Sequence, residues 1–291
     1  MAFALCLMAA LPGVTQAQVG GPADPEKACA YINARYSTCG KRFDYDGKSF
    51  FFTIGSTTKR LDCTDGRKLE YYDRIDQMDM ASVFFVPYIA GPMKLPEVRR
   101  NYDPGRLRSE ELMKAVYGID EAHVWDNLVK VRFLNQTLRM NKKLGAAAAL
   151  ARAGVELEAL AKTDPAVAKF LLPFTRTEKP LQVYGWVWRV VAGTERLSTH
   201  SFGTAIDILT NVGPQYWLND ERVANPAKAK QGEQAYRNDH YIPKGAPIFN
   251  QKVVDVMEKN GYIWGAKWNH YDTMHFEYRP EFLPKSVIDC R

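Results

Sequence analysis

The sequence predicts an α+β fold, because strand-like and helix-like segments occupy different parts of the chain. Between residues 40 and 90, aromatic-rich runs alternate with Gly and Asp turns, so we expect Ser49–Ile54 and Ser82–Val86 to form strands. After residue 109, capping residues and Ala- and Leu-rich runs predict helices. The length of 291 residues allows one domain with an extension or two small domains.

Four helices are expected, each with a capping or stop signal. In chain order they are a helix after Ser109 that ends near Gly118, a helix capped by Asp120, a helix over residues 144–162 that stops at Asp164-Pro165, and a helix over residues 250–260 ended by Gly261. Ser and Asp side chains accept hydrogen bonds from the first N–H groups of a helix, whereas Pro and Gly end it. Residues 211–245 are rich in Asn, Pro, Gly and charge, which is typical of a surface insertion.

Composition excludes two classes of protein. The net charge of +6 is dispersed, since contiguous basic residues occur only in pairs and no stripe alternates basic with aromatic side chains. This pattern argues against a nucleic-acid partner. Apolar residues at 46% and charged residues at 25% are ordinary for a globular protein, so disorder is not indicated.

Residues 1–17 are predicted to be a signal peptide. They are mostly apolar, lack Lys and Arg, and end in Thr15-Gln-Ala17, a small-x-small cleavage pattern before Gln18. The stretch is too short to be a comfortable membrane span, and no other segment approaches that length, so we expect no stable membrane insertion. We therefore expect a periplasmic or secreted protein.

Cysteine usage agrees with export. Cys6 would leave with the signal peptide, and the four cysteines that remain are Cys29, Cys39, Cys63 and Cys290. An even number suits two disulfides in an oxidising compartment. Three pairings are possible, and a bridge to Cys290 would tie the C-terminal tail to the N-terminal segment. Because no CxxC occurs, a cysteine-based zinc site is not expected.

Metal-binding residue types gather in the window over residues 197–208 and in a second motif, residues 272–275. A catalytic zinc ion takes three protein nitrogen or oxygen ligands and leaves a fourth position for water. His200, Asp207 and His275 supply two imidazoles and a carboxylate, and they are the predicted zinc (Zn²⁺) ligands. Gly203 would let a strand carrying His200 turn back. Ala205 would leave room for metal and substrate.

These residues resemble the SxHxxGxAxD signature of the LAS metallopeptidases, the group of lysostaphin, D-Ala-D-Ala carboxypeptidase and sonic hedgehog. Residues 261–268 and 272–280 are also similar to the second half of a VanY-type D-alanyl-D-alanine carboxypeptidase domain. The resemblance implies a small, mostly antiparallel sheet that bears the ligands and packs on helices. It places a zinc peptidase domain at residues 81–291, with its diagnostic part at residues 180–285, after the predicted signal peptide (1–17) and a disulfide-tied N-terminal region (18–80).

The resemblance also implies a function and a catalytic base. Asp272 occupies the position of the family's catalytic carboxylate, which takes a proton from the attacking water. Many D,D-peptidases of the group have Glu there, whereas Asp is found in the L-alanyl-D-glutamate peptidases and part of the VanY-type set. We expect zinc-dependent hydrolysis of peptidoglycan stem peptides, with D-alanyl-D-alanine carboxypeptidation first. The alternatives are an endopeptidase of stem or cross-bridge and a non-catalytic, zinc-stabilised wall-binding module, against which the intact Asp272 argues.

Further polar residues are candidates for substrate contact. Arg189 and Arg196 would clamp a substrate carboxylate with a planar guanidinium group, and Arg189 is favoured because the family keeps an Arg at a comparable place. The alternatives are a solvated strand face for Arg196 and packing on a tryptophan for Arg189. Ser198 either hydrogen-bonds ligand groups or substrate, or lies in a turn.

Residues near the motifs and isolated histidines receive lesser roles. Glu277 is expected to orient an imidazole rather than to be a fourth ligand. His123, His240 and His270 fit no ligand spacing, so metal binding is not expected of them. His270 precedes Asp272 by two residues and is a candidate for lining the cleft.

Overall fold

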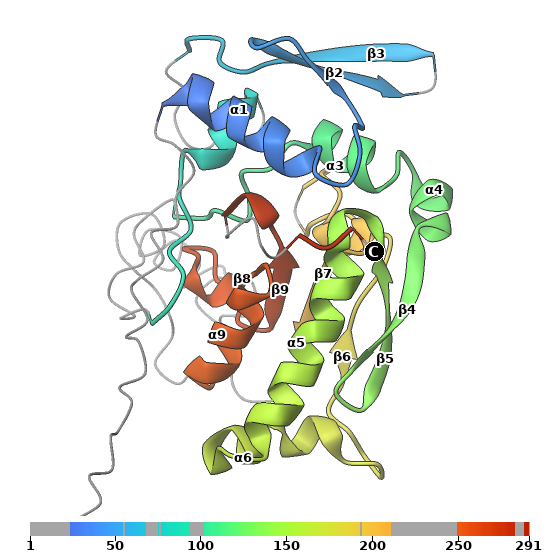
Figure 1. The fold of residues 1–291 in the computed structure, drawn as a ribbon, viewed down its shortest axis with the longest axis vertical. Coiled ribbons are helices and arrows are strands. Elements are labelled where there is room, and N and C mark those ends of the chain that lie inside the picture. Colours follow the sequence, from blue (N-terminus) through green and yellow to red (C-terminus); the bar gives the residue numbers. More distant parts are fainter. Residues whose placement is uncertain are drawn as a thin grey trace, which may run out of the picture.

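The computed structural model describes residues 24–54, 56–67, 75, 77–92, 102–192, 194–210, 249–282 and 288–290. The predicted signal peptide at residues 1–17, the predicted insertion at residues 211–245 and His240 lie outside the described residues. Within them, helices and small antiparallel sheets combine as Figure 1 shows, so the α+β prediction is confirmed.

The elements follow one another in a mixed order along the chain. They are α1 (Pro25–Tyr36), β1 (Asp44–Tyr45), β2 (Ser49–Ile54), β3 (Thr57–Asp62), the 3-10 helix η1 (Met80–Phe84), α3 (Glu110–Tyr117), α4 (Glu121–Asp126), β4 (Leu128–Phe133), β5 (Gln136–Asn141), η3 (Lys143–Gly145), α5 (Ala146–Ala161), α6 (Pro165–Thr175), β6 (Val183–Tyr184), η4 (Thr199–Phe202), β7 (Ala205–Ile208), α9 (Gln251–Lys259), β8 (Tyr262–Trp264), η6 (Gly265–Lys267), β9 (His275–Tyr278) and η7 (Pro280–Phe282).

The N-terminal elements form a layer of their own at the top of Figure 1. Strands β1, β2 and β3 make an antiparallel sheet in that order. Phe50 and Phe52 are two residues apart on β2, so both side chains point to the same face of the sheet, where both are fully buried. They belong to a core cluster that also contains Leu112 of α3, Phe202 of η4 and Phe282 of η7. Residues on both sides of the expected boundary at residues 80 and 81 therefore share one core.

This layer contains one disulfide and is joined to the C-terminal tail by a second, so the two disulfides predicted from the four cysteines are present. Cys29 of α1 pairs with Cys63, which follows β3. Cys39 pairs with Cys290 across a sequence separation of 251 residues. Of the three possible pairings, the structure thus has the one that ties the C-terminal tail to the segment after α1.

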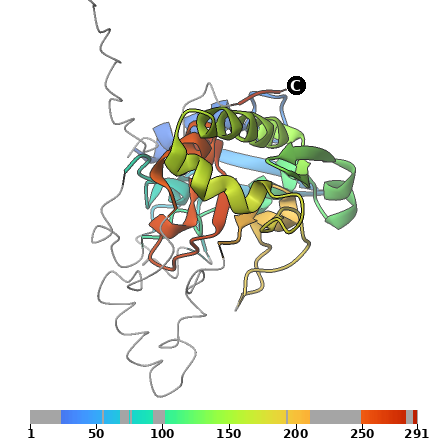
Figure 2. The same ribbon diagram turned by 90° about the horizontal axis from the view of Figure 1, so that it is seen from below.

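A second antiparallel sheet, with strand order β6-β7-β9-β8, lies in the middle of the molecule. Neighbouring residues on a strand face opposite sides of the sheet. Ile206 and Phe276 point to one side and join a core with residues of α5 and α9. Figure 2 shows the green helices α5 and α6 beside each other, and α5 also contacts α9. Asp207 and His275 alternate with these apolar residues, so they face the other side.

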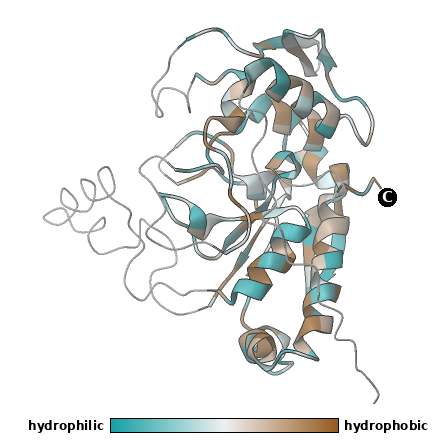
Figure 3. Cartoon of the chain, turned by 60° about the vertical axis from the view of Figure 1, so that its left-hand side comes forward, coloured by the Kyte–Doolittle hydropathy of each residue, from teal (hydrophilic) through white to brown (hydrophobic). Residues whose placement is uncertain are grey.

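The four predicted helices are present with the expected caps. Ser109 accepts a hydrogen bond from the N–H of Leu112 at the start of α3, and Asp120 does the same for His123 at the start of α4. The other two helices are α5 and α9, close to the expected ranges. Figure 3 shows how hydrophilic and hydrophobic residues alternate along these helices, as expected for elements that cover a core.

The strand expected at Ser82–Val86 is wrong, because Met80–Phe84 form the 3-10 helix η1. The cause is a local cap. The Asp79 carboxylate accepts hydrogen bonds from the Ser82 N–H at 2.9 Å and from the Ser82 hydroxyl at 2.5 Å. Such contacts between a side chain and the following backbone favour a helical turn over an extended strand.

No helix in the part of the chain that the structure describes combines the length and apolar character needed to cross a bilayer.

The disulfides give a test of the fold. Peptide mapping of the purified protein under non-reducing conditions should find Cys29 linked to Cys63 and Cys39 linked to Cys290. Replacing Cys39 and Cys290 together by Ser should lower the free energy of unfolding by ~2–5 kcal/mol, because the unfolded chain loses a constraint on a long loop. Denaturant unfolding of the variant and the wild type would measure the difference. Four freely alkylated cysteines would contradict the pairing.

Candidate metal centre

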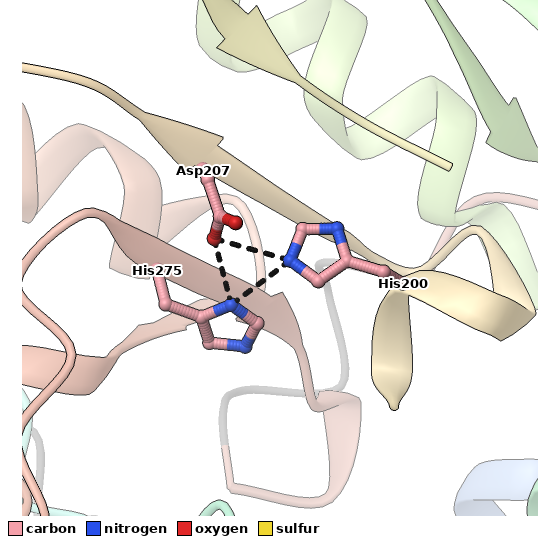
Figure 4. Close-up of side chains that lie close together, drawn as sticks. All are labelled: His200, Asp207 and His275. Atoms are coloured by element: carbon pink, nitrogen blue, oxygen red, sulfur yellow. Dashed lines mark hydrogen bonds and ion pairs between the residues drawn. The ribbon is translucent and has the colours of Figure 1, made fainter. Parts of the chain in front are cut away.

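Three side chains converge on one point at the polar side of the ligand-bearing sheet (Figure 4). His200 Nε2 lies 3.1 Å from Asp207 Oδ1 and 3.2 Å from His275 Nδ1, and the last two atoms lie 3.0 Å apart. Ligand atoms around a tetrahedral zinc ion are about 3.3 Å apart, given bonds of ~2.0–2.1 Å. The three residues predicted as ligands therefore form a set that could hold a metal ion of this kind.

The register of two strands places the carboxylate beside one imidazole. In the antiparallel pair of β7 and β9, Asp207 lies directly opposite His275, and Ala205 lies opposite Glu277. Side chains directly opposite each other on one face of an antiparallel pair are in contact. Ala205 is fully buried, and its expected part in leaving room for metal and substrate stays a prediction.

His200 comes from a short helix, not from the strand that the spacing suggests. Its element, η4, is a 3-10 helix capped by Ser198, whose hydroxyl accepts a hydrogen bond from the His200 N–H at 3.3 Å. Gly203 ends this helix with a φ of 65°, in the left-handed region. A Cβ atom there would come within 2.5 Å of Leu128 Cδ2. The left-handed φ and this crowding together favour glycine at the return into β7.

Asn141 of β5 holds this turn, a role that its sequence context does not indicate. Its side-chain amide donates to the carbonyl oxygens of Tyr117 and Phe202, each at 3.0 Å. Its backbone N–H donates to the carbonyl oxygen of Gly203 at 2.8 Å. The turn that presents His200 is thus fixed from outside the motif by a buried amide.

The outward nitrogen of each imidazole has its own acceptor. His200 Nδ1 lies 2.7 Å from the carbonyl oxygen of Gly185, and His275 Nε2 lies 3.1 Å from Glu277 Oε2. With these nitrogens protonated as donors, His200 Nε2 and His275 Nδ1 carry the lone pairs that face the cluster. Glu277 is therefore placed where the sequence predicts it, as a partner that orients an imidazole.

The electrostatics of the cluster favour a positive charge at its centre. Burial opposes charge on Asp207, but the neighbouring His200 and His275 hold its pKa well below the usual range. Burial alone would lower the pKa of His275, whereas hydrogen bonds to Asp207 and Glu277 raise it to about 10. In the metal-free protein a proton is thus held between two carboxylates. A metal cation would take the place of that proton.

Asp272 lies beside the cluster and lines the same pocket as His275. Burial raises its pKa to about 7, and the negative charge of Asp207 contributes in the same direction. Its Oδ1 atom is buried and has no hydrogen-bond partner among the described residues. The backbone is held firmly, since the Asp272 N–H donates to the Gly265 carbonyl oxygen at 3.0 Å. An unpaired buried carboxylate oxygen next to a metal site is suited to accept a proton from bound water.

The structure separates the two arginines proposed for substrate binding. Arg189 lines the pocket with Ser198, Asp272 and His275. Arg196 is not among the lining residues. Its guanidinium group donates to the carbonyl oxygens of Arg106 at 3.0 Å and Arg108 at 2.9 Å, where it supports the neighbouring backbone. Arg196 therefore lies apart from Arg189 and outside this pocket, and a substrate clamp at Arg196 stays an untested prediction.

The two other histidines that the structure describes, His123 and His270, lie outside the cluster. His270 lines the pocket, and its Nδ1 lies 2.8 Å from Asp103 Oδ2. Asp103 is completely buried and also accepts from the His270 N–H at 2.7 Å. His123 is an exposed residue of α4 that contacts Asp120 at 2.7 Å. The pairing of Asp103 with His270 was missed from the sequence, because 167 residues separate the two.

Comparison with known families agrees with this site. Residues 192–278 match the family model described as D-alanyl-D-alanine carboxypeptidase, which confirms the resemblance inferred from the two motifs. The matched segment contains all three residues of the cluster, together with Asp272 and Glu277. No curated protein and no solved structure matches the chain significantly.

The cluster predicts stoichiometric metal binding. The purified protein should hold close to one zinc ion, and His200→Ala should lose it, because two ligands no longer complete the site. His123→Ala is the matched control, since this exposed histidine lies outside the cluster. Elemental analysis after dialysis would measure the zinc content of each variant. A wild-type protein without zinc would refute the proposed ligand set.

Proposed function

We propose that the protein is a zinc-dependent peptidase that hydrolyses peptide bonds in peptidoglycan stem peptides, with D-alanyl-D-alanine carboxypeptidase as its activity. One observation carries the proposal. Two imidazoles and a carboxylate converge beside the unpaired carboxylate of Asp272, within a segment that matches the D-alanyl-D-alanine carboxypeptidase family model.

Each residue would have a defined part in hydrolysis. His200, Asp207 and His275 would hold the zinc ion, which when bound lowers the pKa of water towards ~7 and polarises the scissile carbonyl. Asp272 would accept the proton of the attacking water and pass it to the leaving amine. Burial raises the pKa of Asp272 in the metal-free protein, and a bound zinc ion would act in the opposite direction on this carboxyl group.

Substrate would be oriented by cationic groups on the pocket wall. Arg189 lies on that wall with Asp272, and a guanidinium group can bind a carboxylate through two parallel hydrogen bonds. The terminal carboxylate of a stem peptide is such a partner. Ser198 also lines the pocket while it caps η4, so both roles considered for it are compatible with its place.

The disulfides support export as part of the proposal. Cys29–Cys63 and Cys39–Cys290 are bonds of the kind that persist in oxidising compartments. A periplasmic or secreted location is also where peptidoglycan is accessible. The net charge of +6 would favour approach to an anionic cell wall.

Digestion of purified peptidoglycan tests the activity. The protein should release free D-alanine, which mass spectrometry of the soluble products would identify. Asp272→Asn should slow the release by ~10²–10⁴-fold, because an amide cannot accept the proton of the attacking water. The zinc content of this variant should stay at the wild-type value.

The other products have distinct meanings. New amino termini within stems or cross-bridges would replace the carboxypeptidase proposal by an endopeptidase. Retained wall binding without any cleavage would point to a zinc-stabilised binding module. Near-normal hydrolysis by Asp272→Asn would move the base elsewhere, with Glu277 as the first residue to examine.

Arg189 gives a second test. Arg189→Ala should raise KM for a peptide with a free terminal carboxylate by ~10–100-fold, the range expected when a hydrogen bond to a charged group is lost. Steady-state kinetics on a synthetic stem peptide would measure KM and kcat separately. Arg132→Ala, on the exposed face of β4, is the control for loss of one positive charge. An unchanged KM in Arg189→Ala would place the carboxylate at another group.

A further inference from the structure

A chain of buried polar contacts runs from the candidate ligand His275 to the N-terminal helix α1. His275 Nε2 lies 3.1 Å from Glu277 Oε2, and Glu277 Oε1 accepts from Arg279 Nη1 at 3.0 Å. Arg279 Nε donates to Glu281 Oε1. The other oxygen of Glu281 accepts from the hydroxyl of Tyr36 at 2.7 Å. No member of this chain is more than 6% exposed.

Arg279 is the centre of the chain and also contacts the pocket wall. Besides the two carboxylates, its guanidinium group donates to the carbonyl oxygen of Pro104 at 3.3 Å and to that of Leu107 at 3.0 Å. The segment between these carbonyls carries Gly105 and Arg106, which line the pocket. One guanidinium group therefore supports both an imidazole of the cluster and the facing loop.

We propose that Tyr36, Glu281 and Arg279 are positioning residues of the metal centre, through which α1 holds the imidazole of His275 in place. The proposal rests on the zinc-binding role of the cluster proposed above. It goes beyond that role because it makes the N-terminal helix, which lies outside the segment matched by the family model, a part of the site.

The physical reason lies in the balance of charges around Arg279. A buried ion is stable only while its hydrogen-bonding partners remain complete. In the native arrangement, Tyr36 satisfies one oxygen of Glu281 and Arg279 satisfies the other. Without the Tyr36 hydroxyl, Glu281 would depend on Arg279 alone and would draw the guanidinium group away from Glu277. Glu277 would then lose a contact that keeps its carboxylate directed at His275, so the imidazole would be held less firmly in one orientation.

The two disulfides hold α1 and Tyr36 in place, at the far end of this series of polar contacts. Cys29 lies on α1 itself and is bonded to Cys63. Cys39 follows Tyr36 by three residues and is bonded to Cys290. The hydroxyl of Tyr36 is thus presented from a helix with a covalent tie on each side. Such a support suits a group that must hold a distant ligand in one orientation.

The experiment compares zinc dissociation constants of full-length variants by competition with a chelator. Tyr36→Phe should raise the zinc Kd about tenfold, at the lower end of the 10–100-fold range for partners that support metal ligands. Tyr262→Phe is the matched control, since its hydroxyl is equally buried and donates to the Ala146 carbonyl oxygen at 2.9 Å, outside the chain. The Tyr262→Phe control should leave the zinc Kd unchanged, although its Tm should fall by about as much as the Tm of Tyr36→Phe.

A double-mutant cycle separates positioning from general stability. If Tyr36 acts through Glu277, Tyr36→Phe should have little further effect on the zinc Kd in a Glu277→Gln background. Additive effects of the two substitutions would overturn the proposal. So would a Tyr36→Phe protein whose Kd equals that of the wild type, or a Tyr262→Phe protein whose Kd rises as much. A wild-type protein that binds no zinc would instead refute the proposed function, and this proposal with it.

Discussion

The pairing of β7 with β9 is the constraint on which the candidate site depends. It sets Asp207 opposite His275 on one face and leaves Ile206 and Phe276 to the core on the other. A shift of the register by one residue would turn every side chain of a strand to the opposite face. The apolar packing against α5 and α9 therefore fixes the place of the polar residues as well. Stability and the geometry of the cluster come from the same pairing.

Burial of charge is the second feature that organises the site. Asp207, Glu277 and Glu281 are buried carboxylates, and each has cationic or hydrogen-bonding partners. Unpartnered polar groups in such surroundings cost free energy. Asp272 stands out against this background, because one of its buried oxygens has no partner in the described part of the chain. The site thus satisfies its structural charges and leaves an acceptor at the pocket.

What could be predicted from the sequence was mostly local. Caps such as Ser109 and Asp120 act within three residues, so the helices that they begin were predicted near their true ranges. The cluster was predicted because its motif keeps a fixed spacing. Two local predictions failed for a local reason, since the caps Asp79 and Ser198 form 3-10 helices where strands were expected.

Contacts between residues far apart in the sequence could not be predicted in this way. Tyr36 and Glu281 are 245 positions apart, and Asp103 and His270 are 167 apart, so no spacing rule connects them. The helix α6 was missed because Asp164 and Pro165 were interpreted only as a stop, although the same pair also begins the next helix. An Asp-Pro pair can mark the end of one helix or the start of the next, and here it marks both, because α6 forms and packs against α5.

The bond between Cys39 and Cys290 sets an order of events during biosynthesis. Its two sulfur atoms cannot meet until residue 290 has left the ribosome, 251 residues after Cys39. His200, Asp207 and His275 all lie inside the loop that this bond closes. A nascent chain that has not yet reached residue 290 therefore lacks the covalent tie that encloses the cluster, and this tie can form only late in synthesis or after it.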